Sequence, residues 1–201
     1  MRKVGAIVLN APYLDIPIKE DFIICADGGY DLIKGAYSCN VLIGDMDSIK
    51  SVPDGVIKIV CPKVKDYTDG ERAIQYAKEI GLRDIVIYGG TGGRTDHVYS
   101  NLVLLKQARD LEINAVMKAR NEEIRFVNQG DVVSLDVSKG TTISLLPFLD
   151  SVTVSNSSGL FYPYNDLTIY RDTTLGMSNE AIEGHISFKI TKKSAFLFIN
   201  K

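Results

Sequence analysis

The fold is decided by the stretch at residues 84–105, which reads DIVIYGGTGGRTDHVYSNLVLL. Its first part, Asp84 to Tyr88, is a short apolar run that predicts a buried strand. Glycines follow at once, and the segment from Asp96 to Leu111 then spaces its apolar side chains along one face of a helix. A strand that leads through a glycine-rich turn into a helix is typical of an α/β protein.

The first half of the chain repeats this alternation up to about Lys118. Its predicted strands are Lys3–Leu9, Phe22–Ala26, Val41–Ile43, Val56–Val60, Asp84–Tyr88 and Ile113–Met117. A second helix is predicted from Asp69 to Ile80, and a further helix begins after Asp27-Gly28-Gly29. Strands that alternate with helices indicate a mainly parallel, Rossmann-like α/β domain with right-handed crossovers, which we place at residues 1–122.

The second half has a different rhythm, because the helical periodicity disappears after Asn121. Short strands separated by turn residues are predicted at Glu123–Asn128, Val132–Leu135, Thr141–Leu146, Val152–Val154, Glu183–Ile190 and Ala195–Ile199. This pattern is typical of a small antiparallel β-sandwich, which we place at residues 123–201. The predicted fold class is therefore α/β, with a parallel α/β domain followed by a β-sandwich.

The composition favours a globular protein with a small-molecule partner. Of 201 residues, 45% are apolar and 24% are charged, which is enough to form a core in one or two domains. A formal net charge of -2 and the lack of a long run of Lys and Arg argue against nucleic-acid and membrane binding. Three cysteines without a Cys-x-x-Cys pair predict reduced, packed thiols in a cytoplasmic protein.

Three acidic clusters each follow a predicted strand. They are Gly44-Asp45-Met46-Asp47-Ser48, Asp66-Tyr67-Thr68-Asp69 and Gly93-Arg94-Thr95-Asp96-His97. The carboxyl ends of neighbouring strands face one crevice, so these carboxylates are expected to converge although they lie far apart in the sequence. Converging carboxylates repel one another unless a cation lies between them, and oxygen ligands suit Mg²⁺. The clusters therefore predict a magnesium site over a phosphate-bearing substrate.

Each cluster also has a purely structural interpretation. Asp45 and Asp47 stand at alternate positions of an extended loop and can both face the crevice, but a solvated turn before a helix cap has the same pattern. In the second cluster a capping box accounts for the threonine and leaves Asp66 and Asp69 free to reach a metal or a ligand. Asp96 is either a functional carboxylate or the N-cap of the helix that follows it.

Three segments are candidates for binding phosphate. The glycines from Gly89 to Gly93 allow a phosphate to approach the backbone at a helix N-terminus, and Arg94 can donate two hydrogen bonds to it. Asp27-Gly28-Gly29 allows a similar approach, although a tight turn needs the same glycines. Lys63 and Lys65 either contact phosphate oxygens or are ordinary surface lysines.

Taken in order, these motifs resemble those of the thiamine pyrophosphokinase family. The set comprises Ala26-Asp27-Gly28-Gly29, Gly44-Asp45-Met46-Asp47-Ser48-Ile49, Asp66-Tyr67-Thr68-Asp69, Gly93-Arg94-Thr95-Asp96-His97 with Asn101, and Ser178-Asn179-Glu180. The resemblance covers nearly the whole chain and is more specific than any single motif. It implies an α/β catalytic domain, a β-sandwich that helps to bind thiamine, and a homodimer with the site near the subunit interface.

The resemblance also implies roles for individual residues. The magnesium ligands would be Asp45, Asp47 and Asp69, and the catalytic set adds Arg94 and Asp96. The nucleotide-binding set would be Asp27, Gly28, Gly29, Lys65, Asp66, Gly92, Gly93 and Arg94, and the thiamine-binding set Asp96, Ser158, Tyr162, Ser178 and Asn179. Tyr162 stands in Gly159-Leu160-Phe161-Tyr162-Pro163, where the family often has Trp, and a Tyr ring attracts a cationic ring more weakly than Trp does.

The implied reaction moves a diphosphate from ATP to the primary alcohol of thiamine and releases AMP, with Mg²⁺ as cofactor. Positioning and charge stabilisation would supply most of the catalysis, and either Asp69 or Asp96 would accept the alcohol proton. Two alternatives stay open, namely another Mg²⁺-dependent phosphotransferase or phosphohydrolase and a thiamine-binding protein without catalysis. A third interpretation, in which every carboxylate is a cap or a surface charge, does not explain the glycines beside them at strand ends.

Overall fold

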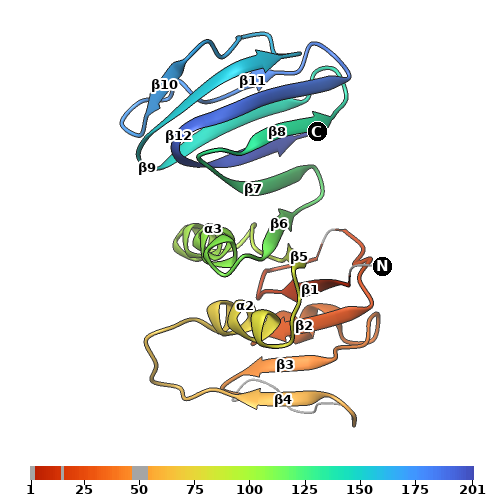
Figure 1. Cartoon of the computed structure of the whole chain (residues 1–201). Helices are drawn as coiled ribbons and strands as arrows, with labels where there is room; N and C mark the ends of the chain where they lie inside the picture. Colours follow the sequence, from red (N-terminus) through yellow and green to blue (C-terminus); the bar gives the residue numbers. More distant parts are fainter. Residues whose placement is uncertain (1–2, 15, 47–53) are drawn as a thin grey trace. The chain divides into compact units, whose positions relative to one another are not determined.

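The structure is a computed structural model that describes residues 3–14, 16–46 and 54–201. It confirms a mixed α/β fold, and its internal contacts divide the chain into two units, Met1–Arg120 and Asn121–Lys201 (Figure 1). The observed boundary lies between residues 120 and 121, whereas the change of sequence period predicts one between residues 122 and 123. Each unit has its own hydrophobic core.

Within the described residues, the first unit is built on a sheet of six parallel strands. They are β1 (Val4–Val8), β2 (Phe22–Ala26), β3 (Val41–Gly44), β4 (Ile57–Val60), β5 (Asp84–Tyr88) and β6 (Asn114–Lys118). Their order across the sheet is β6-β5-β1-β2-β3-β4. The chain steps outward from β1 to β4 and then returns to the other side of β1 with β5. The crevice between β1 and β5 is therefore a topological switch point, where open α/β sheets bind their ligands.

Three helices pack on this sheet in the described part of the unit. They are α1 (Gly29–Ile33), α2 (Asp69–Glu79) and α3 (Thr95–Asp110), and both longer helices lie within one residue of their predicted bounds. Val8, Leu42 and Cys25 share a core with Tyr30 and Ile33 of α1, whereas α2 packs against β1, β2, β3 and α3. The four strands β1, β2, β3 and β5 are buried almost continuously, as expected for a parallel sheet covered by helices. The outermost strands β4 and β6 are more exposed. None of the described helices is long and apolar enough to cross a membrane.

The three cysteines are packed in this first unit. Cys25, Cys39 and Cys61 are all buried and free of disulfides, which confirms the prediction of packed thiols. Small apolar side chains of this kind fill gaps between strands and helices, so they need no chemical role.

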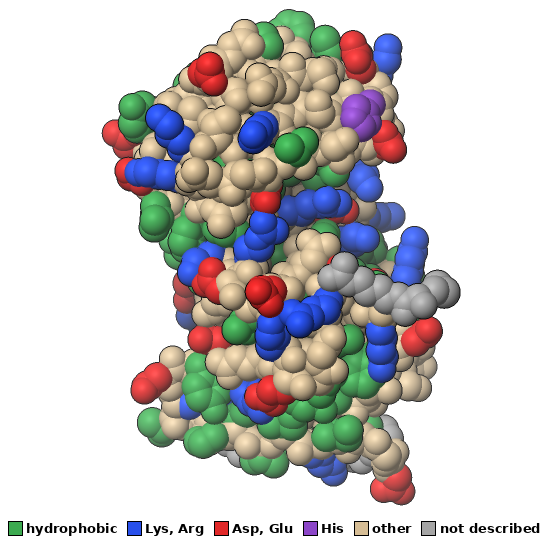
Figure 2. Space-filling view, viewed as in Figure 1, with side chains coloured by type: hydrophobic (Ala, Val, Ile, Leu, Met, Phe, Trp, Pro, Cys, Tyr) green, Lys and Arg blue, Asp and Glu red, His purple; other side chains and the backbone are tan. Residues whose placement is uncertain are grey.

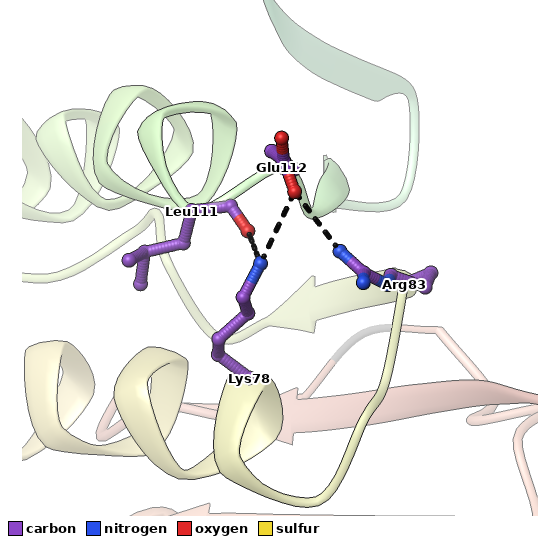
Figure 3. Close-up of polar contacts among 4 residues, drawn as sticks. All are labelled: Lys78, Arg83, Leu111 and Glu112. Carbon is purple, nitrogen blue, oxygen red and sulfur yellow. Dashed lines mark hydrogen bonds and ion pairs between the residues drawn. The ribbon is translucent and has the colours of Figure 1, made fainter.

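A polar network fixes the end of α3 against α2 (Figure 3). Lys78 of α2 donates a hydrogen bond to the backbone carbonyl of Leu111 at 2.6 Å, and its ammonium lies 3.4 Å from Glu112 Oε2. Arg83 lies 3.3 Å from the same carboxylate oxygen. The Leu111 carbonyl lies at the C-terminal end of a helix, where unpaired carbonyls carry partial negative charge, so the ammonium pairs this group and complements the helix dipole.

The second unit consists of antiparallel strands. They are β7 (Glu122–Asn128), β8 (Val132–Asp136), β9 (Thr142–Ser158), β10 (Leu167–Tyr170), β11 (Asn179–Glu180) and β12 (His185–Asn200). β12 pairs with β7, β8 and β9, and β9 also pairs with β10 and β11. Alternate residues of these strands, such as Ile143, Leu145, Val152, Val154 and Leu197, form the core.

Two strands of this unit are longer than the sequence predicts. β9 replaces the two predicted strands at 141–146 and 152–154, and β12 replaces those at 183–190 and 195–199. The ladder between them shifts register between Ile190 and Lys192 and again between Lys193 and Ala195. Such irregularities are β-bulges, which bend a strand without ending it. The short strands β10 and β11 were not predicted.

Candidate active site

Two cavities of the first unit open at the carboxyl ends of β1, β2 and β5. The first has a volume of about 320 Å³ and is lined by Leu9, Asn10, Ala26, Asp27, Thr68, Asp69, Gly70, Asp96, His97, Ser100 and Asn101. The second has a volume of about 380 Å³ and is lined by Asn10, Ala11, Pro12, Gly89, Gly90, Thr91, Gly93, Arg94, His97, Val98 and Asn101. Asn10, His97 and Asn101 line both, so the two cavities adjoin at the switch point.

The N-terminus of α2 places Asp69 in the first cavity. Thr68 is the N-cap of this helix and accepts a hydrogen bond from the backbone N–H of Glu71 at 3.1 Å, which confirms the predicted cap. Asp69 is the first helical residue, where the helix dipole favours a carboxylate. A Cβ at the next residue, Gly70, would lie 3.1 Å from Leu9, so the start of α2 packs tightly against the end of β1.

Lys65 forms an ion pair with Asp69, one of the predicted magnesium ligands. Its ammonium is 2.9 Å from Asp69 Oδ1, and the two side chains are only 11% and 21% exposed. Desolvation by burial lowers the pKa of Lys65, but the hydrogen bond and charge of Asp69, aided by Cys61 and Asp45, outweigh it and raise the pKa above its ordinary value. The charge of Asp69, with a smaller contribution from Asp45, therefore favours a cation at the position of the Lys65 ammonium.

These two carboxylates fit a magnesium ion, because Mg²⁺ prefers oxygen ligands and is often bound through one or two carboxylates. The third predicted ligand, Asp47, lies outside the described residues. Among residues 3–14, 16–46 and 54–201, no group of three or more His, Cys, Asp or Glu side chains is arranged to hold a metal ion. A magnesium site made by Asp45, Asp47 and Asp69 stays a prediction.

Asp27 lines the first cavity, whereas the glycines after it pack against β1. Asp27 has a φ of 47°, and its backbone N–H donates to the carbonyl of Ile43 at 2.7 Å. A Cβ at Gly29 would lie 2.2 Å from the carbonyl oxygen of Val8, and one at Gly28 would lie 2.7 Å from the side chain of Asn10. The close approach that these glycines allow is thus made within the protein, and their contact with a nucleotide stays a prediction.

The loop after β5 forms a wall of the second cavity. Gly89 has a φ of 68°, and a Cβ there would lie 2.5 Å from the carbonyl oxygen of Leu9, so only glycine fits this close approach to β1. Asn101 of α3 donates a hydrogen bond to the carbonyl of Gly90 at 3.0 Å and holds the loop against the helix. Gly92, with a φ of 81°, completes the turn.

Arg94 and Asp96 form an ion pair at the start of α3. Arg94 Nη2 lies 2.6 Å from Asp96 Oδ2, and the side chains are 75% and 63% exposed. The hydrogen bond from Arg94 holds the pKa of Asp96 below its ordinary value. Arg94 occupies the N-cap position, and Asp96 lies inside the helix, so the interpretation of Asp96 as the N-cap is wrong. The pair is accessible to a ligand, since Asp96 lines the first cavity and Arg94 the second.

The four remaining candidates lie in the second unit, around residues 158–164 and 178–179. Ser158 Oγ is 2.9 Å from Ser187 Oγ on β12. Tyr162 is 63% exposed as a residue, and its ring packs edge to face against Phe161, with 4.9 Å between ring centroids. Ser178 has a φ of 57°, while Asn179 is only 4% exposed and hydrogen-bonds to the backbone of Tyr162.

The linings of the two cavities differ in part from the predicted set of site residues. Asp66 is exposed and is absent from the linings of both cavities described above. The same linings also lack five other predicted site residues of the described part of the first unit, namely Gly28, Gly29, Asp45, Lys65 and Gly92. Asn10, which lines both, was not among the predicted site residues. It directly follows the apolar run of β1, but only the strand order shows that β1 borders the switch point.

Comparison with known proteins agrees with this architecture. Two family models match the chain, "Thiamin pyrophosphokinase, catalytic domain" at residues 15–117 and "Thiamin pyrophosphokinase, vitamin B1 binding domain" at residues 130–194. The chain belongs to the thiamine pyrophosphokinase family. This family consists of enzymes, so both the predicted family and the prediction of an enzyme are confirmed.

Relatives within the thiamine pyrophosphokinase family are similar over most of the chain. Thiamine pyrophosphokinase of Bacillus subtilis (strain 168) is 30% identical over 158 residues, which cover 74% of this chain and 72% of the relative. Thiamin pyrophosphokinase 1 of Caenorhabditis elegans is 27% identical over 192 residues, covering 89% and 79%. The crystal structure of the Bacillus subtilis thiamine pyrophosphokinase matches with a TM-score of 0.87 at 24% identity over 99% of both chains, which shows the same fold.

Proposed function

We propose that this chain transfers the diphosphate of ATP to the hydroxyl of thiamine and releases AMP. The observation that carries the proposal is the pair of adjoining cavities at the switch point, which combine Asp69 and Asp96 with the glycine loop and Arg94. The matching catalytic and vitamin B1 binding family models support it. In finer detail, we assign the first unit as a Rossmann-like nucleotide-binding domain and the second as a β-sandwich that helps to bind thiamine.

The second cavity suits the polyphosphate of ATP. The N-terminus of α3 borders it, so backbone N–H groups and the positive end of the helix dipole favour an anion there. Arg94 can release its hydrogen bonds to Asp96 and donate to phosphate oxygens instead. Both side chains are well exposed, so Asp96 would not be left as a buried, unpaired charge. These groups would hold the phosphates in line for displacement, which is the main requirement in phosphoryl transfer.

The first cavity suits the metal and the reacting alcohol. We assign Asp45, Asp47 and Asp69 as the residues that would hold Mg²⁺, which when bound would neutralise charge on the polyphosphate. We assign Lys65, which pairs with Asp69, to contact phosphate oxygens when a metal shares that carboxylate. Asp69 and Asp96 both line this cavity, so either can accept the proton of the alcohol.

We further propose that the protein is a cytoplasmic homodimer. Apart from Phe161 and Tyr162, the second unit exposes large apolar side chains, each 44–60% exposed, at Leu149, Tyr170, Leu175, Met177 and Ile182. Figure 2 shows hydrophobic side chains on the surface of this unit. Exposed apolar groups of this number suit an interface with a second copy. Three buried free thiols suit a reducing compartment.

The decisive experiment incubates the protein with ATP, Mg²⁺ and thiamine and follows both nucleotide and thiamine products. Formation of AMP and thiamine diphosphate in equal amounts is expected. Formation of ADP would indicate a different phosphotransferase, phosphate release without thiamine diphosphate a phosphohydrolase, and thiamine binding without turnover a binding protein.

Substitution of the carboxylates tests their roles in the same assay. Asp45→Asn and Asp69→Asn should each lower kcat by a factor of about 100 or more while thiamine binding is largely retained. Asp110→Asn is the matched control, because Asp110 pairs with Lys106 at the end of α3 and lines neither of the two cavities. Retention of full activity in Asp45→Asn and Asp69→Asn would remove the basis for the assigned metal site.

A further inference from the structure

Asn179 is a buried amide beneath the loop that carries Phe161 and Tyr162. Its Oδ1 accepts hydrogen bonds from the backbone N–H of Tyr162 at 3.0 Å and of Glu180 at 2.8 Å. Its Nδ2 donates to the backbone carbonyl of Tyr162 at 2.7 Å. The side chain therefore pairs with both backbone groups of Tyr162, in the way that a neighbouring strand would.

The rings above this amide are accessible, although their backbone is fixed. Phe161 and Tyr162 are 59% and 63% exposed and meet edge to face, with an interplanar angle of 84°. On either side of Tyr162 the loop is held by a hydrogen bond from the Phe161 N–H to the Glu180 carbonyl and by one from the Tyr164 N–H to Ser157 Oγ. Asn179 supplies the bonds at Tyr162 itself.

The residue before Asn179 has an unusual backbone. Ser178 has a φ of 57°, in the left-handed region that residues other than glycine seldom adopt. Its N–H donates to Ser144 Oγ at 3.0 Å, and Ser144 is itself only 4% exposed. A strained backbone persists only where surrounding contacts hold it, and here the contacts of Ser178 and of the neighbouring Asn179 side chain hold it.

We propose that Asn179 is a positioning residue, which fixes the backbone of Tyr162 and so presents the Phe161–Tyr162 ring pair to the flat, cationic rings of thiamine. This inference rests on the proposed function. It differs from the expectation that Asn179 contacts thiamine, because the side chain is only 4% exposed. Its Oδ1 already accepts from two backbone N–H groups, and its Nδ2 donates to the Tyr162 carbonyl. Asn is needed rather than Asp, since a carboxylate cannot donate to the Tyr162 carbonyl.

Loss of this amide should weaken thiamine binding selectively. Without this amide, the Tyr162 backbone would be free to move and would have to be ordered when thiamine binds. The entropic cost of fixing the backbone of one residue corresponds to about a tenfold loss of affinity. Asn179→Ala and Asn179→Asp should therefore raise the KM for thiamine about tenfold, while the KM for ATP and kcat change less than about twofold. Ser155→Ala is the matched control, because Ser155 is equally buried in β9, and its thiamine KM should stay unchanged.

A fluorescent reporter tests the positioning directly and without turnover. The chain contains no Trp, so Tyr162→Trp introduces a single indole at the end of the loop. Adding Asn179→Ala to this variant should lower the fluorescence anisotropy of that indole, whereas adding Ser155→Ala should not. If Asn179→Ala fails to fold, Asn179→Asp takes its place in both measurements. A carboxylate can still accept from the N–H groups of Tyr162 and Glu180 and loses only the hydrogen bond donated to the Tyr162 carbonyl.

The outcomes separate this inference from the proposed function. An unchanged thiamine KM, or an equal rise in the KM for ATP, would overturn the positioning role even in an active enzyme. A protein without any thiamine diphosphate formation would overturn the proposed function, and the anisotropy would then still decide whether Asn179 orders the loop. Unchanged anisotropy would overturn the inference in either case.

Discussion

The pair of Lys65 and Asp69 offers a sharp test, through the substitution Lys65→Met. Methionine keeps most of the apolar length of lysine but removes the ammonium, which lies 2.9 Å from Asp69 Oδ1. At that distance two unit charges attract each other by about 1.4 kcal/mol in water and by about 6 kcal/mol at an effective dielectric constant of about 20. Desolvation of both groups and remaining screening by solvent offset much of this attraction, so we expect the free energy of unfolding to fall by about 1–2 kcal/mol.

Magnesium should restore part of this loss if Asp69 and Asp45 bind it. The ion would then replace the missing ammonium, whereas in the unsubstituted protein it must compete with Lys65. A ligand that binds only the folded state stabilises it in proportion to its affinity, so excess Mg²⁺ should raise the stability of Lys65→Met more than that of the unsubstituted protein.

Urea denaturation followed by circular dichroism, with EDTA or with excess Mg²⁺, measures both effects. Lys106→Met is the control, because Lys106 forms a more exposed ion pair with Asp110 on α3 and its removal should change stability by less than about 0.5 kcal/mol. The reasoning fails if Lys65→Met is as stable as the unsubstituted protein in EDTA. It also fails if Mg²⁺ stabilises both proteins equally.

Three further outcomes are expected. Gly29→Ala should lower the free energy of unfolding by about 1–3 kcal/mol in urea, because its Cβ would lie 2.2 Å from the Val8 carbonyl oxygen and force α1 away from β1. Arg94→Gln should raise the pKa of Asp96 towards its ordinary value in an NMR titration of the carboxyl carbons, and an unchanged pKa would contradict the ion pair. Glu122→Gln should stabilise the protein at neutral pH, because burial raises the pKa of Glu122 and disfavours its charged form in the folded state. In urea titrations at several pH values this gain should shrink as the pH falls through the folded pKa and vanish below the ordinary value of 4.5.

Local patterns predict the first unit well, because its elements have strong periodicity. The buried strands are nearly continuous apolar runs, and α2 carries an apolar face with Ala73, Ile74 and Ala77. In the second unit the sequence predicts breaks inside β9 and β12, because the residues that tolerate a bulge also favour turns. Lys193, for example, has a φ of 59° within β12. A sequence does not distinguish a turn from a bulge when long-range pairing decides the outcome.

The site was predictable where it depends on strand ends and unpredictable where it depends on strand order. Asp27, Asp69 and Asp96 follow separate strands, and the structure brings them to one cavity. Asn10 joins them only because β5 returns beside β1, a pairing that no local pattern encodes. Asn179 shows a different limit, since a short polar motif looks the same whether its amide meets a ligand or a buried backbone.

The position of Asn10 between the two cavities has a consequence for the length of the ligands that they can bind. Because this residue lines both cavities, an elongated molecule can lie across the two compartments, whereas a compact one fills a single compartment. We expect a nucleoside triphosphate to bridge them and a monophosphate to occupy only one. A product confined to one compartment would then make fewer contacts than the substrate and dissociate more readily.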